Sequence, residues 1–163
     1  MGRVLIAIGF ILVFSSCSHS YYIVRHAEKT AQEANVTSDV PLTEKGKQRA
    51  EALKEVLKDK NIRYVFSTNT IRTKSTAQPT ADQFHLTLEM YGQRPDSAFI
   101  ALLKSRKKNT LVVGHSNTVD DIVNMLCGEK KITGDLADNE YDNLFIVKKK
   151  GKKYIYSLQK FGN

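Results

Sequence analysis

The sequence is poor in the residues that build disulfide-stapled or metal-clamped scaffolds. It has two cysteines, three prolines and no tryptophan among 163 residues. Two thiols allow at most one disulfide bond, so a disulfide framework and a four-cysteine zinc site are excluded. An HExxH motif, a P-loop and a dinucleotide-binding glycine pattern are also missing. Metalloprotease, P-loop nucleotidase and Rossmann dehydrogenase functions therefore have no support.

Acidic residues are scarce relative to basic ones. Lysine and arginine number 25 against 17 aspartates and glutamates, which gives a formal net charge of +8 at pH 7. Hydrophobic residues make up 41% of the chain and charged residues 26%, close to the averages for soluble globular domains. The length suits one domain with its own core, and the positive charge predicts anionic partners.

The start of the chain shows the pattern of an export signal. Arg3 precedes an apolar run over residues 4–14, which is followed by Ser15, Ser16 and Cys17. An apolar helix of this length is too short for a hydrocarbon core of roughly 30 Å, and the pattern is typical of a signal peptide. The small residues before the cysteine resemble a bacterial lipoprotein signal, in which the cysteine is lipidated and becomes the new amino terminus.

We therefore expect residues 1–16 to be a lipoprotein-like signal peptide and residues 17–163 to form the mature domain. Ordinary secretory cleavage near the same place is the alternative. Either route exports the protein to the cell envelope, where it is lipid-anchored to a membrane through Cys17 or periplasmic.

Apolar segments alternate with helical patterns in the rest of the chain. The expected strands are residues 21–24, 62–66, 86–90 and 111–113, and the expected helices follow Thr43 and cover residues 70–84, 96–105 and 118–127. This alternation predicts an α/β fold of three layers, α/β/α, with a mainly parallel sheet. Segments 144–147 and 154–158 predict a C-terminal antiparallel hairpin. In the last helix, the pattern places Asp120 toward water or the edge of the sheet.

Five lysines crowd the predicted hairpin, at positions 148, 149, 150, 152 and 153. The favoured interpretation is a solvated turn between two strands. A patch that touches anionic lipid headgroups is the alternative. Nucleic-acid binding is not expected, because no aromatic platforms interleave with these lysines.

Histidines and arginines follow the predicted strands at their carboxyl ends. Arg25 and His26 end the first strand, Arg72 lies in the turn after the second, and Gly114 and His115 end the fourth. In open α/β sheets, ligands bind beyond these strand ends. We expect the four charged or titratable side chains to converge on one site.

These residue types suit phosphoryl transfer. A neutral histidine is a nucleophile, and adjacent arginines favour the neutral form. Guanidinium groups bind the phosphoryl oxygens of a dianion through paired hydrogen bonds, as Arg25 and Arg72 would do. His115 would donate to the same oxygens, and Gly114 would let the backbone approach closely. The scheme requires no metal and no cofactor.

Four motifs in the same order resemble those of the histidine phosphatase superfamily, which has the phosphoglycerate mutase-like fold. They are YIVRHAEK at residues 22–29, LTEKG at 42–46, the segment 67–77 and VVGHSNT at 112–118. The resemblance covers nearly the whole mature chain.

The resemblance implies that His26 is the phosphorylated nucleophile and that Arg25, Arg72 and His115 bind the phosphoryl group. Lys29 stands where the phytase branch of the family has another arginine, so it is a further candidate for phosphate binding. The usual glycine after the first histidine is Ala27 here, and Ser116 occupies the position of the phytase acid.

The proton donor to the leaving group is not assigned by the sequence. Its candidates are Glu28, Glu89, Asp96 and Asp120. A weak or absent acid favours phosphohistidine, whose nitrogen leaving group is easier to expel than an alcohol.

The sequence thus predicts a metal-independent phosphohydrolase that acts on phosphomonoesters or phosphohistidine, in a small molecule or a phosphoprotein, through phospho-His26. The spacings between His26, Arg72 and His115 leave no room for a cap domain, so the pocket should be open and mutase activity is disfavoured. The alternative is a non-catalytic envelope lipoprotein that binds a phosphorylated ligand.

Overall fold

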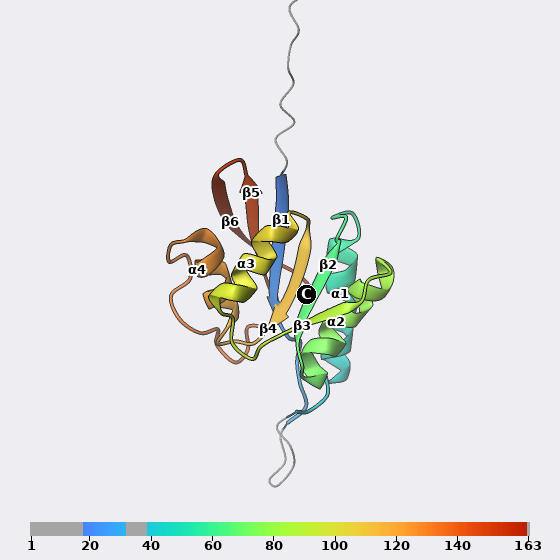
Figure 1. The fold of residues 1–163 in the computed structure, drawn as a ribbon. Helices are drawn as coiled ribbons and strands as arrows, with labels where there is room; N and C mark the ends of the chain where they lie inside the picture. The colour runs from blue at the N-terminus through green and yellow to red at the C-terminus, as the bar shows by residue number, and fades with distance from the viewer. Residues whose placement is uncertain (1–17, 32–38, 163) are drawn as a thin grey trace, which may run out of the picture.

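The computed structural model describes residues 18–31 and 39–162, and within them it shows a six-stranded sheet and four helices (Figure 1). The predicted signal peptide and Cys17 lie outside the described residues. The elements in chain order are β1 (Ser18–Arg25), α1 (Glu44–Leu57), β2 (Tyr64–Thr68), α2 (Ile71–Gln83), β3 (Leu88–Tyr91), α3 (Ser97–Arg106), β4 (Thr110–Gly114), α4 (Val119–Cys127), β5 (Asn143–Lys150) and β6 (Lys153–Lys160).

The sheet has the strand order β3-β2-β4-β1-β5-β6. Strands β3, β2, β4 and β1 are mutually parallel, and β5 and β6 continue the sheet in antiparallel pairs. The carboxyl ends of β1, β2 and β4 therefore meet at one edge. This arrangement is the predicted parallel sheet with a C-terminal hairpin.

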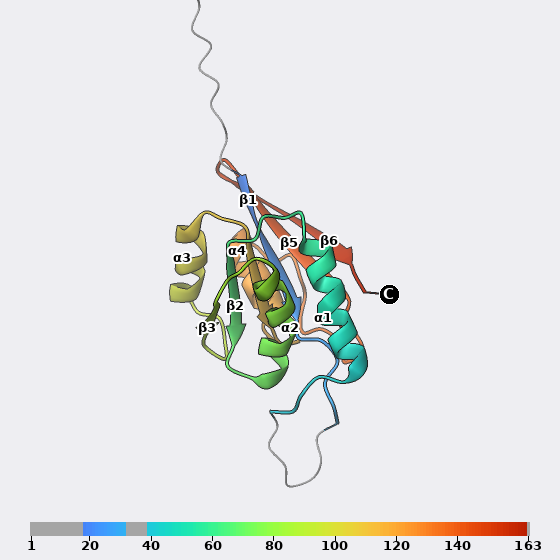
Figure 2. The same cartoon turned by 90° about the vertical axis from the view of Figure 1, so that its right-hand side faces the viewer.

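Alternation of side chains along the buried strands creates two cores. Tyr21 and Ile23 of β1 pack with apolar residues of α3 and α4, whereas Tyr22 and Val24 pack with those of α1 and α2. A strand with apolar residues on both faces must be covered on both sides. Figures 1 and 2 show the resulting three layers, with the sheet between the two pairs of helices.

Two local expectations are corrected by the structure. Lys148–Lys150 belong to β5, and only Gly151 and Lys152 form the hairpin turn, with Gly151 at a φ of 58°. Asp120 is 7% exposed and does not face water, because the α4 face that carries it turns toward the protein.

Helix α2 continues through Pro79, which removes one backbone hydrogen bond without ending the helix. None of the helices in the described ranges has the length and apolar character needed to cross a membrane.

Candidate active site

One pocket of about 720 Å³ collects the residues predicted from the sequence. Its lining includes Arg25, His26, Lys29, Arg72 and His115. These residues come from the end of β1, the start of α2 and the end of β4, as the parallel arrangement requires. All the residues predicted to bind or attack the phosphoryl group thus line one pocket, and Cys17 lies outside the described residues.

His26 is 3% exposed and is fixed at both its backbone and its ring. Its backbone N–H donates to the carbonyl oxygen of Gly114 at 2.9 Å, which continues the pairing of β1 with β4. Its Nδ1 lies 2.8 Å from the carbonyl oxygen of Ala27. A carbonyl oxygen only accepts hydrogen bonds, so Nδ1 carries the proton and Nε2 carries the lone pair.

Burial holds the pKa of His26 well below its usual range, at about 3. The hydrogen bond to Ala27 raises this pKa, but the nearby His115, Arg25 and Arg72 lower it further. The imidazole is therefore neutral at pH 7, as a nucleophile requires.

His115 faces His26 with the two ring centroids 5.5 Å apart. Its Nε2 lies 2.9 Å from Thr68 Oγ1, and its backbone N–H donates to Thr118 Oγ1 at 2.9 Å. Burial lowers the pKa of His115 to about 4, and Arg72 and Arg25 lower it too. Two neutral imidazoles thus lie between two arginines.

Gly114, directly before His115, is required by packing. A Cβ atom there would lie 2.8 Å from the hydroxyl oxygen of Tyr91 and 3.0 Å from Thr118 Oγ1. This glycine admits the tyrosine and threonine that support the end of β4.

Arg25 is 5% exposed and is held by the loop between α4 and β5. Its Nη1 donates to the carbonyl oxygens of Ala137 at 2.8 Å and Asp138 at 3.3 Å. The guanidinium lies 4.2 Å from the centre of the Tyr141 ring, and its Nη2 donates to the tyrosine hydroxyl at 3.4 Å. The Nε of Arg25 is buried without a hydrogen-bond partner in the described part of the chain.

Arg72 lies in the first turn of α2, whose N-cap is Thr70. Asp39 contacts this turn twice, because its Oδ1 accepts from the backbone N–H of Ile71 at 2.7 Å and lies 3.7 Å from Arg72 Nη1. Thr76 Oγ1 accepts from the backbone N–H of Ala27 at 2.9 Å and donates to the Arg72 carbonyl oxygen at 2.8 Å. The motif at 67–77 thus connects α2 to the segment after His26.

The LTEKG motif holds the same segment from the other side. The Glu28 carbonyl oxygen accepts from the backbone N–H of Thr43 at 2.9 Å, and a Cβ atom on Gly46 would lie 2.1 Å from that oxygen. Thr43 also caps α1 through Gly46 N. Only glycine allows α1 to approach the segment this closely.

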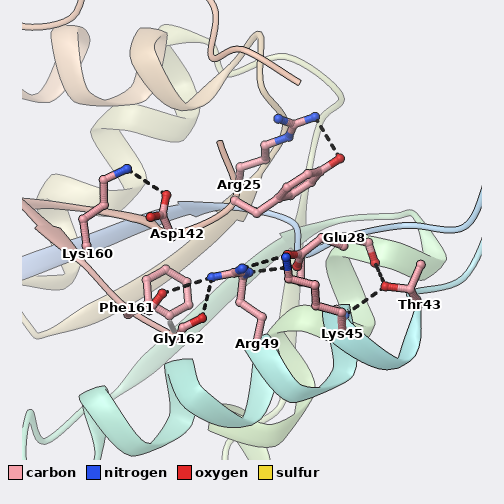
Figure 3. Close-up of polar contacts among 12 residues, drawn as sticks. Arg25, Glu28, Thr43, Lys45, Arg49, Asp142, Lys160, Phe161 and Gly162 are labelled. Carbon is pink, nitrogen blue, oxygen red and sulfur yellow. Dashed lines mark hydrogen bonds and ion pairs between the residues drawn. The ribbon is translucent and has the colours of Figure 1, made fainter. Parts of the chain in front are cut away.

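The Glu28 carboxylate belongs to this support and not to the pocket. It receives two hydrogen bonds from buried Arg49, at 2.8 and 2.7 Å, and Arg49 Nη1 donates to the carbonyl oxygens of Phe161 and Gly162 (Figure 3). Burial raises the pKa of Glu28, but the bonds from Arg49 outweigh it, and the pKa falls below its usual value. Glu28 is therefore an anchor held in its ionised form.

The other proton-donor candidates also lie elsewhere. Glu89 pairs with Arg106 at 2.7 Å on the edge strand, and Asp96 caps α3 by accepting from Phe99 N. Asp120 is buried in α4, and burial raises its pKa. Neither Glu28 nor any of these three residues lines the pocket. The carboxylates that line it are those of Asp39, Asp135 and Asp138.

Sequence reasoning missed several residues of the pocket. Tyr141 has no motif signal, because its relevance comes from a loop that folds back over Arg25. The remaining polar lining residues are Asn69, Thr70, Gln93, Arg94, Ser116 and Asn117. Their position directly after β2, β3 and β4 was the available signal, since loops at these strand ends form the site. Among the described residues, no cluster of three or more His, Cys, Asp or Glu side chains is arranged to hold a metal ion.

Comparisons with known proteins agree with this geometry. Residues 21–94 match the sequence profile of the histidine phosphatase superfamily (branch 1). No curated protein matches the chain in sequence. Several solved structures are similar to this chain in fold, and three of them are compared by TM-score, sequence identity and coverage.

The protein histidine phosphatase SixA, solved as a tungstate complex, superimposes with a TM-score of 0.67 at 20% identity, over 86% of this chain and 96% of that one. YhfR from Bacillus stearothermophilus superimposes with a TM-score of 0.65 at 15% identity, over 86% of this chain and 96% of that one. A phosphoglycerate mutase from Bacillus anthracis superimposes with a TM-score of 0.54 at 17% identity, over 91% of this chain and 94% of that one. The chain has the phosphoglycerate mutase-like α/β fold, and its residues 21–94 are similar in sequence to the histidine phosphatase superfamily (branch 1).

Proposed function

We propose that this protein is a phosphatase in which the substrate phosphorylates His26 and water then hydrolyses the phosphohistidine. The observation that carries the proposal is the state of His26, a buried neutral imidazole whose Nδ1–H is fixed on the Ala27 carbonyl. This leaves the Nε2 lone pair for attack on phosphorus. The superfamily match over residues 21–94 includes this residue.

Arg25, Arg72 and His115 would bind the phosphoryl oxygens. A phosphoryl group at Nε2 of His26 would lie among these side chains, which line the same pocket. Arg72 lies at the amino-terminal end of α2, where the helix dipole also favours an anion. Lys29 lines the pocket and would add a positive charge at its rim.

Two steps complete the reaction. In the first, Nε2 forms a bond to phosphorus while the bond to the leaving group breaks. In the second, water attacks phospho-His26 and releases phosphate, which restores neutral His26. Both steps place negative charge on the same phosphoryl oxygens, so one set of arginines serves both.

The pocket favours a nitrogen leaving group, as in phosphohistidine. Two of its three carboxylates face arginines, since Asp39 pairs with Arg72 and Asp138 lies 3.9 Å from Arg25 Nη2. A carboxylate that faces a guanidinium serves as a hydrogen-bond acceptor, whereas a leaving group that needs a proton requires a donor. Alcohol leaving groups need such a proton far more than imidazole does. We therefore propose phosphohistidine on a protein as the preferred substrate class over phosphomonoesters.

Activity is tested with the purified chain in a chelator. We expect hydrolysis of an aryl phosphate and of a phosphohistidine protein, with kcat/KM higher for the latter. His26→Ala should abolish both activities, and a short reaction with labelled substrate should trap an acid-labile phosphoenzyme on the wild type alone. His85→Ala is the matched control, since His85 is an exposed histidine outside the pocket.

Retention of activity in His26→Ala would exclude the phosphohistidine route. Binding of phosphate or tungstate without hydrolysis of either substrate would instead identify the protein as a phospholigand-binding module of the same fold.

We also propose that residues 1–16 are a signal peptide and that Cys17 is lipidated, which anchors the protein in the cell envelope. The support is the sequence pattern around Cys17. In a bacterial host, the wild type should incorporate labelled fatty acid and fractionate with membranes, and Cys17→Ser should do neither. Release of an unlipidated wild-type chain into the periplasm would favour ordinary secretory cleavage.

A further inference from the structure

Positive charge gathers at the end of the sheet opposite the pocket. Ser18 and His19, at the start of β1, pair with Lys150 and Lys149 of β5. Asn109, before β4, accepts a hydrogen bond from Ser20 N at 2.8 Å. Figure 2 shows the β5–β6 turn, the start of β1 and the loop between α3 and β4 at one end of the molecule. We call the lysines of these segments the cationic end: Lys107, Lys108, Lys148, Lys149, Lys150, Lys152 and Lys153.

Lysines that are distant in the sequence lie close to the same two side chains at this end, His19 and Tyr154. Burial lowers the pKa of His19, and the charges of Lys149 and Lys107 lower it further. The ring of Tyr154 has the Nζ atom of Lys149 at 4.0 Å from its centroid and that of Lys104 at 5.1 Å. The hairpin and the α3–β4 loop therefore form one continuous cationic surface.

The segments that carry these lysines contribute no counter-charge of their own. Segments 18–25, 97–114 and 143–160 contain no aspartate or glutamate. In the described part of the chain, none of the seven lysines of the cationic end has an ion pair, whereas six other lysines do: Lys45, Lys47, Lys54, Lys58, Lys131 and Lys160. Lys150 and Lys153 lie directly opposite each other on paired strands, which is repulsive. An external anionic surface would relieve this repulsion.

We propose that the cationic end binds the surface of a bilayer that contains anionic lipids. The β5–β6 hairpin places Ile155, 48% exposed, opposite Lys148 on the same face, so an aliphatic side chain accompanies the lysines. The tyrosines of the hairpin, Tyr154 and Tyr156, are half-buried against the core and offer no exposed ring for base stacking. This combination suits lipid headgroups better than a nucleic acid.

The position of the start of β1 agrees with a membrane partner. Ser18 pairs with Lys150, and Cys17 precedes Ser18 in the sequence, so an acyl group on Cys17 would be attached one residue from the cationic end. Stable anchoring takes two signals, and the lysines would supply the second. The proposal stands on the lysines alone and does not require lipidation or phosphatase activity.

Vesicle binding of the full chain tests the proposal at about 0.1 M salt, where the Debye length is roughly 10 Å. The probes are phosphatidylcholine vesicles with and without about one-third phosphatidylglycerol. The test variant is K150Q/K152Q/K153Q, which also removes the repulsive pair and so should fold. Since each lysine near an anionic surface contributes about 1 kcal/mol, we expect its affinity for the anionic vesicles to fall about a hundredfold.

The matched control is K47Q/K74Q/K160Q, which removes three charges at the starts of α1 and α2 and the end of β6, away from the cationic end, and should change this affinity less than about threefold. All variants keep residues 1–17, so any contribution of that segment is common to them. Equal binding of the wild type to neutral and anionic vesicles, or equal losses in the two triple variants, would overturn the proposal. Duplex DNA that binds more tightly than the vesicles and displaces them would reassign the surface to nucleic acid.

Discussion

At the residue scale, the two pocket histidines should make stability depend on pH. The pKa of His26 is about 3 in the folded protein against 6.5 for the free side chain. Below pH 6.5 the unfolded chain binds a proton that the folded chain excludes. The stabilising effect of a neutral His26 is therefore fully present above pH 6.5 and is lost as the pH falls toward 3. His115, with a pKa of about 4, acts in the same direction.

We predict that the free energy of unfolding of the wild type falls between pH 6.5 and pH 5, with His26 accounting for about 2 kcal/mol of the fall. Urea titrations at several pH values measure this directly. In His26→Gln the fall should be smaller by that amount. Identical pH profiles of the two proteins would show that His26 titrates normally in the fold.

Tyr141 should position Arg25 through its ring and not through its hydroxyl. The ring lies under the guanidinium, 4.2 Å from its centre, whereas the hydroxyl bond is long at 3.4 Å. We predict that Tyr141→Leu raises KM for an aryl phosphate about fivefold, since such a contact contributes about 1 kcal/mol, with a smaller change in kcat. Tyr141→Phe keeps the ring and should stay within about twofold of the wild type.

Steady-state kinetics of the two Tyr141 variants separate these roles. Equal KM values for the Leu and Phe variants would mean that the carbonyl oxygens of Ala137 and Asp138 suffice to hold Arg25. Sequence alone did not suggest Tyr141, because it is 116 residues from Arg25 and meets it only after the α4–β5 loop folds back. The gathering of Arg25, His26, Arg72 and His115 in one pocket was predictable, because each lies at or directly after a strand end or in the first turn of a helix.

At the element scale, the approach of α1 to the segment after His26 depends on Gly46. A Cβ atom at this position would lie 2.1 Å from the Glu28 carbonyl oxygen, so the backbone must move. We predict that Gly46→Ala destabilises the fold by about 2 kcal/mol, in spite of the better helix propensity of alanine, and lowers kcat/KM by displacing His26. Urea unfolding and phosphatase assays measure both effects.

Gly92→Ala is the control for Gly46→Ala, because a Cβ atom on Gly92 would lie 3.5 Å from the Arg94 carbonyl oxygen, which is an ordinary contact. Its stability should stay within about 0.5 kcal/mol of the wild type. A Gly46→Ala protein as stable and active as this control would show that α1 can shift without moving the catalytic segment.

The elements themselves were predictable because their patterns are strong. Apolar runs indicated the strands that became β1 and β4, and Thr43 marked the start of a helix. The extent of the hairpin was not predictable, because lysines are poor strand formers and suggested a turn. Pairing with β1 overrides that preference and extends β5 to Lys150. Asp120 was not expected to be buried, because periodicity shows which face of a helix is apolar and not whether a polar residue beside that face is also covered.

At the scale of the whole molecule, the positive charge divides between the two ends of the sheet. Arg25 and Arg72 belong to the pocket, and the lysines of the cationic end lie at the start of β1. Strand β1 has eight residues and so separates the two ends by about 23 Å. A protein that rests on a membrane by its cationic end would direct the pocket away from the bilayer.

This geometry predicts that membrane binding leaves catalysis unaffected. With a phosphohistidine protein as substrate, kcat/KM of the wild type on anionic vesicles should stay within about twofold of its value in solution, because the Debye length of roughly 10 Å is shorter than the separation of the pocket from the bilayer. Enzyme assays with and without the phosphatidylglycerol vesicles measure this. K150Q/K152Q/K153Q, which should not bind them, corrects for any interaction of the substrate with lipid. Inhibition of the wild type alone would mean that binding through the cationic end hinders access to the pocket. Equal inhibition of the two proteins would mean that the anionic surface is bound by the strand ends that carry Arg25 and Arg72.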